Sequence, residues 1–161
     1  MATIGYKHEQ FLKDINTMAV WVQTWEEVQS DYIRWRPTTI ISIARGGLIP
    51  GVYLSHLLGI RNIPIVWQTR DGSMKESPPL ISDDHQILIV DDINDSGQTF
   101  TEIMDDIRNN NSHLDDAKIK RNVKTMSLFT RSSSNFNVDF SPNKLDNDFW
   151  IHFPWEKKLY A

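Results

Sequence analysis

The sequence of 161 residues contains no cysteine, which excludes disulfides, thiolate zinc sites and cysteine nucleophiles and suits a reducing compartment. It also lacks any apolar run that approaches the ~18–20 residues needed to cross a membrane. The first ten residues are polar and lack the apolar core of a signal peptide. We therefore expect a cytoplasmic protein with no membrane partner.

Positive charge is in deficit, because 17 Lys and Arg residues stand against 21 Asp and Glu residues and give a net charge of −4. This balance and the lack of a basic cluster argue against a nucleic-acid partner. The chain also lacks a Walker loop and a GxGxxG loop, so an NTPase or dinucleotide site is disfavoured. An anionic ligand would have to be held by local groups.

The composition is otherwise that of a globular protein, with 40% hydrophobic and 24% charged residues. A chain of this length buries about 70% of its unfolded surface. We predict a single domain over residues 1–161. It divides into an N-terminal helical segment at 1–36, a core at 37–135 and a C-terminal segment at 136–161.

Hydrophobic periodicity predicts an α/β fold. Apolar side chains at intervals of three and four residues predict a helix over 11–32, before Pro37. Short apolar runs predict four strands, at 39–43, 63–69, 87–90 and 123–129. The first is β-branched and continuous, like a strand buried on both faces, and the third contains no polar residue. Helical patterns at 48–58 and 97–108 fall between strands. The alternation predicts a mainly parallel central sheet flanked by helices.

The remaining segments have weaker patterns. Apolar patches at 138–140 and 149–153 predict two short edge strands. Polar stretches at 70–86 and around 109–116 predict loops. The first is long enough to cover a site, and the second is interpreted as a solvated surface insertion.

The most informative segment joins the third strand to the helix that follows. The run 87–90 ends in Asp91 and Asp92, and the turn Asp95–Thr99 leads into the helix. Ligands of open α/β sheets bind beyond the carboxyl ends of the strands, so the two carboxylates can bind sugar hydroxyls or Mg²⁺. The turn can hold a phosphate on the N–H groups of the helix start. A turn that only caps the helix would leave the acidic pair unexplained.

Three segments resemble a known family. Val90–Thr99, an apolar strand with two acids and an acid-Ser-Gly-x-Thr loop, resembles the phosphoribosyl pyrophosphate signature of type I phosphoribosyltransferases. Ile41–Gly51 resembles the pyrophosphate loop of that family, and Asp148–Glu156 resembles the base-binding hood of its bacterial xanthine-guanine (hypoxanthine) branch. The segments occur in the family's order, and the resemblance covers residues 37–156.

The resemblance implies the type I phosphoribosyltransferase fold, a mainly parallel sheet flanked by helices with a small C-terminal hood. It implies a purine salvage enzyme that transfers the phosphoribosyl group of phosphoribosyl pyrophosphate to N9 of guanine, xanthine or hypoxanthine. The products are a nucleoside monophosphate and pyrophosphate. Mg²⁺ is the implied cofactor, and a homodimer or homotetramer is the implied assembly.

The resemblance also assigns residues to the phosphoribosyl pyrophosphate site. Arg45, Gly46 and Gly47 would bind pyrophosphate, beside an unusual peptide conformation at Ala44–Arg45. Asp91 and Asp92 would hold the ribose hydroxyls and Mg²⁺. The 5′-phosphate would lie on four residues of the turn, namely Ser96, Gly97, Gln98 and Thr99. Arg70, in the long loop, would reach pyrophosphate.

A second set of residues is assigned to the base. Asp95 would take the proton at the purine N7 as N9 attacks the anomeric carbon, and such help typically contributes ~10²–10⁴-fold. Trp150 would stack on the purine, and Ile151 would offer backbone groups to its edge. Arg131 occupies the position of a family Lys that reads the purine O6, and His152 replaces a common acid. These two departures leave the preferred purine open.

Other functions share parts of this pattern. The main alternative is a regulator of the same fold that binds phosphoribosyl pyrophosphate or a nucleotide without chemistry. Such regulators often lose the hood or the base reader, so the presence of Trp150 and Arg131 favours an enzyme. An enzyme for another base, such as a pyrimidine, is disfavoured by the Pro154–Glu156 tail. A flavodoxin-like binding domain would not depend on Asp95.

Overall fold

The computed structural model describes residues 2–28, 35–67, 81–82 and 85–156, with the backbone alone at 26–28 and 65–67. Its elements in chain order are β1 (Thr3–Gly5), α1 (His8–Val28), β2 (Thr39–Ala44), α2 (Leu48–Leu58), β3 (Ile65–Trp67), β4 (Ile87–Asn94), α3 (Gln98–Asn110), α4 (Asp116–Asn122), β5 (Val123–Arg131), β6 (Asn143–Leu145), β7 (Trp150–His152) and the 3₁₀ turn η1 (Pro154–Glu156). Within that part of the chain, no helix has the length and apolar character needed to span a bilayer.

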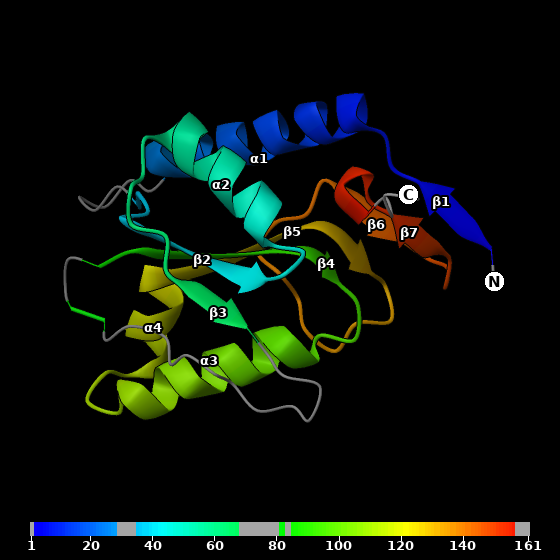
Figure 1. Ribbon diagram of the computed structural model, residues 1–161. Helices are drawn as coiled ribbons and strands as arrows, with labels where there is room; N and C mark the ends of the chain where they lie inside the picture. The colour runs from blue at the N-terminus through cyan, green and yellow to red at the C-terminus, as the bar shows by residue number, and fades with distance from the viewer. Residues whose placement is uncertain (1, 29–34, 68–80, 83–84, 157–161) are drawn as a thin grey trace.

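Five strands form one parallel sheet in the order β3-β2-β4-β5-β6 (Figure 1). β4 lies at its centre and pairs along its length with β5, from Ile87 opposite Val123 to Asn94 opposite Thr130. The four strands predicted from apolar runs are confirmed. β4 continues past the predicted end at Val90, so the acidic pair lies within the strand.

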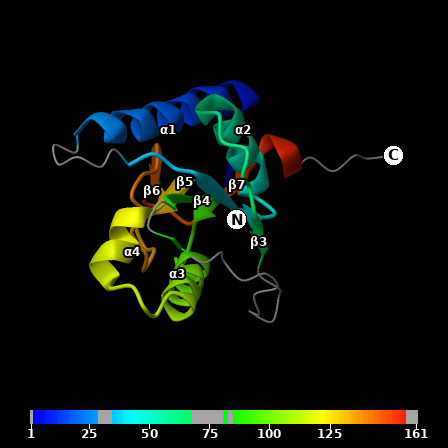
Figure 2. The same cartoon turned by 90° about the vertical axis from the view of Figure 1, so that its left-hand side faces the viewer.

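Helices cover both faces of this sheet, with α1 and α2 on one face and α3 and α4 on the other (Figures 1 and 2). Successive side chains of β4 point to opposite faces of the sheet. Leu88 and Val90 pack in the hydrophobic cluster with α1 and α2, whereas Ile87 and Ile89 pack in the cluster with α3. Burial of each side chain of this size contributes roughly 1.5–3 kcal/mol to the stability of the folded protein. The sheet therefore holds the loops at its edge in fixed positions.

A second, two-stranded parallel sheet brings the N-terminal strand β1 onto β7, with Thr3 opposite Trp150. The backbone N–H groups of Tyr6 and Trp150 donate to the carbonyl oxygens of His152 and Ala2, each at 3.0 Å. The sequence did not predict β1, because three residues carry no readable period. We call β1, β7 and η1 together the hood.

The prediction of an edge strand at 138–140 is wrong. Phe140 forms only an isolated bridge to β5, and the edge strand β6 lies further on, at Asn143–Leu145. The carboxylate of Asp139 explains the difference, because it accepts the backbone N–H of Thr125 at 2.8 Å and its hydroxyl at 2.9 Å. The Asp139 side chain thus accepts a backbone N–H of β5 that a neighbouring strand would otherwise bond through a carbonyl oxygen.

The predicted loop around 109–116 is shorter than expected, since α3 continues to Asn110 and α4 begins at Asp116. Asn111 between them is buried, and its amide oxygen accepts the backbone N–H of Ile81 at 2.7 Å. The interpretation as a solvated insertion is therefore wrong at Asn111, which belongs to the packed interior.

The structure describes only part of two further predictions. The helix expected over 11–32 begins at His8 and is described to Val28, and residues 29–34 lie outside the described part. Residues 68–80 and 83–84, which include most of the predicted loop at 70–86, also lie outside it.

Candidate active site

The carboxyl ends of β2, β4 and β5 bring together the segments that the sequence singled out. β2 ends just before Arg45–Gly47, and β5 ends at Arg131. β4 carries Asp91 and Asp92 and leads into Asp95–Thr99. Because parallel strands end at the same edge of a sheet, these residues gather where α/β sheets bind their ligands.

Asp91 and Asp92 form an acidic pair, in which Asp91 is half-buried and Asp92 is buried. The backbone N–H of Asp92 donates to Asp91 Oδ1 at 2.8 Å, and Asp92 is only 9% exposed. Burial and the neighbouring charge of Asp92 raise the pKa of Asp91 well above its usual range. Burial also raises the pKa of Asp92, to about 6. The ionised pair is therefore costly unless a ligand supplies a cation or hydrogen-bond donors.

Glu156 is a third carboxylate near this pair, and it was not predicted as a site residue. Its charge adds to the effect of burial in raising the pKa of Asp92. Glu156 lies in η1 of the hood, where its Oε2 accepts the backbone N–H of Phe153 at 3.2 Å. The acid that ends the Pro154–Glu156 run was the signal that could have indicated it.

The loop after β2 lies directly against the acidic pair. A Cβ on Gly46 would fall 2.0 Å from Asp92 Oδ2, and a Cβ on Gly47 would fall 2.4 Å from the carbonyl oxygen of Val90. The peptide bond Ala44–Arg45 is cis, which confirms the unusual conformation expected there. Glycine is required at both loop positions, since a side chain would push the loop away from the carboxylates.

The turn after β4 forms a pocket at the start of α3. The pocket is lined by the end of β4 and the turn, namely Asp91, Ile93, Asn94, Asp95, Ser96, Gly97, Gln98, Thr99 and Phe100. Gly97, the N-cap residue, has φ of 86°, a conformation that other residues rarely adopt, and Ser96 Oγ accepts the backbone N–H of Gln98 at 3.3 Å. Ser96 therefore caps one N–H at the start of α3, as the capping alternative expected. The positive end of the α3 dipole also suits a phosphate in this pocket.

A buried network supports this turn from behind, and the sequence did not predict it. The amide nitrogen of Asn94 donates to Thr130 Oγ1 at 2.9 Å and to the carbonyl oxygen of Phe136 at 2.8 Å. Ser134 Oγ donates to Asn94 Oδ1 at 3.0 Å. A Cβ on Gly97 would fall 2.6 Å from the backbone nitrogen of Phe136. These contacts join segments far apart in sequence, so no local signal could have indicated them.

Arg131, expected to read the purine O6, is bonded within the protein. Its Nε forms an ion pair with Asp95. Its Nη1 donates to the carbonyl oxygen of Asn147, and its Nη2 donates to that of Phe149 at 3.0 Å. The Asp95 side chain is still 64% exposed, so a ligand can reach it.

Trp150 lies in β7 and is 51% exposed. The other tryptophans with described side chains pack against aromatic rings, namely Trp21, Trp25, Trp35 and Trp155. Trp150 is therefore the one among them that can offer an open ring face to a flat ligand. Ile151, the next residue, is buried and anchors the strand.

Comparisons with known proteins agree with this geometry. The family described as "Phosphoribosyl transferase domain" matches residues 6–161. This chain belongs to the phosphoribosyltransferase family.

Two curated relatives of this phosphoribosyltransferase are named xanthine-guanine phosphoribosyltransferase. The protein of Cereibacter sphaeroides is 28% identical over 134 residues, which cover 78% of this chain and 71% of the relative. The protein of Idiomarina loihiensis is 27% identical over 129 residues, which cover 75% and 72%.

Solved structures place this phosphoribosyltransferase in the type I fold. A purine phosphoribosyltransferase from Pyrococcus horikoshii has a TM-score of 0.73 at 24% identity and covers 100% of this chain and 98% of its own. A xanthine-guanine-hypoxanthine phosphoribosyltransferase of Helicobacter pylori gives the same TM-score and identity over 94% and 92%. The predicted fold class and the resemblance to this family are confirmed.

The acidic pair of this phosphoribosyltransferase fits Mg²⁺. The ion prefers carboxylate oxygens, keeps several waters and shares substrate phosphates, so two carboxylates suffice. A bound cation would also offset the cost of ionising Asp91 and Asp92, whose pKa values burial raises. Over the described residues, no group of three His, Asp or Glu side chains could hold a metal. The other ligands would come from water and substrate.

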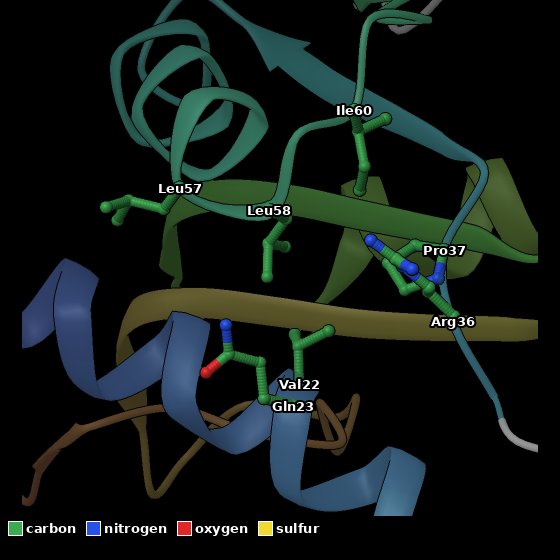
Figure 3. Close-up of a pocket in the computed structure, with 7 residues that line it drawn as sticks. All are labelled: Val22, Gln23, Arg36, Pro37, Leu57, Leu58 and Ile60. Atoms are coloured by element: carbon green, nitrogen blue, oxygen red, sulfur yellow. The ribbon is translucent and has the colours of Figure 1, made fainter.

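Arg70, expected to reach pyrophosphate, lies outside the described residues. A second pocket lies between α1, α2 and the chain entering β2, lined by Val22, Gln23, Arg36, Pro37, Leu57, Leu58 and Ile60 (Figure 3). Because it lies toward the amino end of β2, it is away from the edge where the loops meet.

Proposed function

We propose that this chain is a purine salvage enzyme that transfers the phosphoribosyl group of phosphoribosyl pyrophosphate to N9 of guanine, xanthine or hypoxanthine. The observation that carries the proposal is the acidic pair Asp91–Asp92, which lies between the glycine loop after β2 and the pocket at the start of α3. A matching ligand has a diphosphate, sugar hydroxyls and a second phosphate in that order. The names of the relatives support a purine as acceptor.

Each part of the proposed substrate has its own binding group. The Arg45–Gly47 loop holds pyrophosphate, Asp91 and Asp92 hold the ribose hydroxyls, and Ser96–Thr99 hold the 5′-phosphate. Asp91 and Asp92 would also hold Mg²⁺, which would supply positive charge beside pyrophosphate. The exposed ring of Trp150 stacks on the base, which contributes roughly 1–3 kcal/mol by analogy with base stacking elsewhere.

In the proposed reaction, the purine N9 forms a bond to C1′ of the ribose while the bond from C1′ to the pyrophosphate oxygen breaks. The electron pair of that bond leaves with pyrophosphate. Asp95 accepts the proton that the purine carries at N7, so the product base is neutral. The carboxylates stabilise the positive charge that develops on the sugar.

We further propose that the chain forms a homodimer or homotetramer. α2 exposes four large apolar side chains on one side of the helix, namely Ile49, Val52, Tyr53 and Leu57. Apolar patches of this kind mark surfaces that other proteins cover.

A pyrophosphate-release assay tests the proposed reaction, with phosphoribosyl pyrophosphate, Mg²⁺ and, in separate reactions, guanine, xanthine, hypoxanthine, adenine and uracil. We expect turnover with at least one 6-oxopurine and none with uracil. Removal of Mg²⁺ with a chelator should abolish this turnover. No turnover with any base, together with a melting temperature that phosphoribosyl pyrophosphate still raises, would contradict the proposal in favour of a regulator.

A further inference from the structure

The guanidinium of Arg131 joins two parts of the site that belong to separate elements. Asp95 follows β4 at the phosphate turn, whereas Asn147 and Phe149 precede the hood strand β7. Arg131 contacts all three from the end of β5. Its side chain is only 9% exposed, although its carboxylate partner is largely open to solvent.

The contacts use the fork of the guanidinium. Nε, Nη1 and Nη2 each serve a different acceptor, one a carboxylate and two backbone carbonyls. Bonds from a charged donor are roughly twice as strong as neutral ones, and the planar fork fixes the acceptors relative to one another. A Lys ammonium is a point charge and cannot reproduce this geometry.

The neighbouring residue strengthens the same connection. The backbone N–H of Ser132 donates to the carbonyl oxygen of Leu145 at 2.8 Å, and its hydroxyl donates to Asp146. The segment from Leu145 to Phe149 is therefore tied to the end of β5 at several points. Trp150 follows it directly, so the position of this ring depends on how firmly the segment is held.

We propose that Arg131 is a positioning residue that holds residues 147–149, and through them Trp150, beside Asp95. The inference rests on the proposed function, because it takes Trp150 and Asp95 as the groups that meet the base. Arg131 acts on base binding through these two residues rather than by reading the 6-oxo group. A neutral O6 is a weaker acceptor than the carboxylate that Nε already contacts.

Hydrogen exchange of the unliganded protein tests this role without any substrate. In Arg131→Met, backbone amides of residues 146–152 should exchange about tenfold faster, because charge-assisted bonds that hold the segment are lost. Arg131→Lys should give an intermediate rate, and amides of β2 and β4 should not change. Arg121→Met, on the exposed side of α4, is the matched control and should exchange like the wild type. Unchanged exchange at 146–152 would overturn the proposal.

A second measurement separates positioning from direct reading. The dissociation constants of inosine monophosphate and of purine riboside monophosphate, which lacks the 6-oxo group, are compared in wild type and Arg131→Met. A positioning role predicts that both rise by a similar factor, about tenfold. A rise confined to inosine monophosphate would show that Arg131 reads O6 and would overturn the proposal. Failure of the wild type to bind either nucleotide would contradict the proposed function instead, while the exchange result would stand.

Discussion

At the scale of the residue, the site places negative charge where folded proteins usually avoid it. Asp91, half-buried, and Asp92, buried, lie at the end of an apolar run, with Glu156 nearby. Ionising them costs free energy that substrate and metal offset when they bind. Binding and stability are therefore coupled at these positions. The role of each carboxylate can be tested both by ligand binding and by the stability of the unliganded protein.

Asp92→Asn should stabilise the metal-free protein above neutral pH. The folded-state pKa of Asp92, about 6, exceeds its unfolded value of 3.8, so the folded protein binds more protons and loses stability as pH rises through this window. The variant should raise Tm by about 2–6 °C at pH 8 and hardly at all at pH 4, measured in EDTA. Asp106→Asn on α3 is the control, because the neighbouring Asp105 is paired with Arg108. An equal gain in Tm at both pH values would contradict the argument.

Gly46→Ala should disrupt binding of phosphoribosyl pyrophosphate, since the added Cβ would fall 2.0 Å from the Asp92 carboxylate. We expect kcat/KM to fall about 10²-fold, in line with the cost of a displacement near 1 Å at a catalytic centre. Gly5→Ala is the matched control, because no atom lies within 4 Å of its Cβ position. Equal kinetics for the two variants would exclude close contact between the glycine loop and the acidic pair.

Asp95→Asn tests the proton acceptor. Turnover should fall ~10²–10⁴-fold, because the amide cannot take the N7 proton. The dissociation constant for phosphoribosyl pyrophosphate, measured by calorimetry, should change little. Asp106→Asn on α3 should leave both unchanged. Undiminished turnover in Asp95→Asn would remove this residue from the mechanism.

At the scale of the element, local pattern predicted the strands and loops that carry their own signal. β4 begins with the continuous apolar run 87–90, and β2 and β5 are rich in β-branched and apolar residues. The acidic turn after β4 is a contiguous motif. β1 and β6 are three-residue strands whose pairing partners lie elsewhere in the chain, so no period could reveal them. The contacts of Asn94 and Arg131 escaped prediction for the same reason.

Removal of residues 2–5 should show what β1 contributes. The hood strand β7 would lose its backbone partner, so Trp150 would be held less firmly. We expect KM for the base to rise several-fold. Binding of phosphoribosyl pyrophosphate should change little, because the loops that bind it follow strands of the five-stranded sheet. Thr3→Ala keeps the backbone pairing and is the control. If only the binding of phosphoribosyl pyrophosphate were weakened, the proposal that β1 supports the base site would be contradicted.

At the scale of the whole molecule, the apolar side of α2 predicts self-association. Val52→Glu places a charge in the middle of this exposed patch, and it should shift the protein to monomers in light scattering coupled to size exclusion. Val20→Glu, at a position on α1 that is more exposed than Val52, should not change the mass. A wild type that is monomeric at micromolar concentration would contradict the proposed assembly.

The pairing of β1 with β7 has a consequence for how the protein is made. Thr3 pairs with Trp150, so the hood can close only after the ribosome has released the chain as far as β7. The residues assigned to pyrophosphate, ribose and 5′-phosphate all lie between Arg45 and Thr99, and they can settle on β2 and β4 much earlier. A nascent chain would thus acquire its sugar-phosphate site first and its base site last.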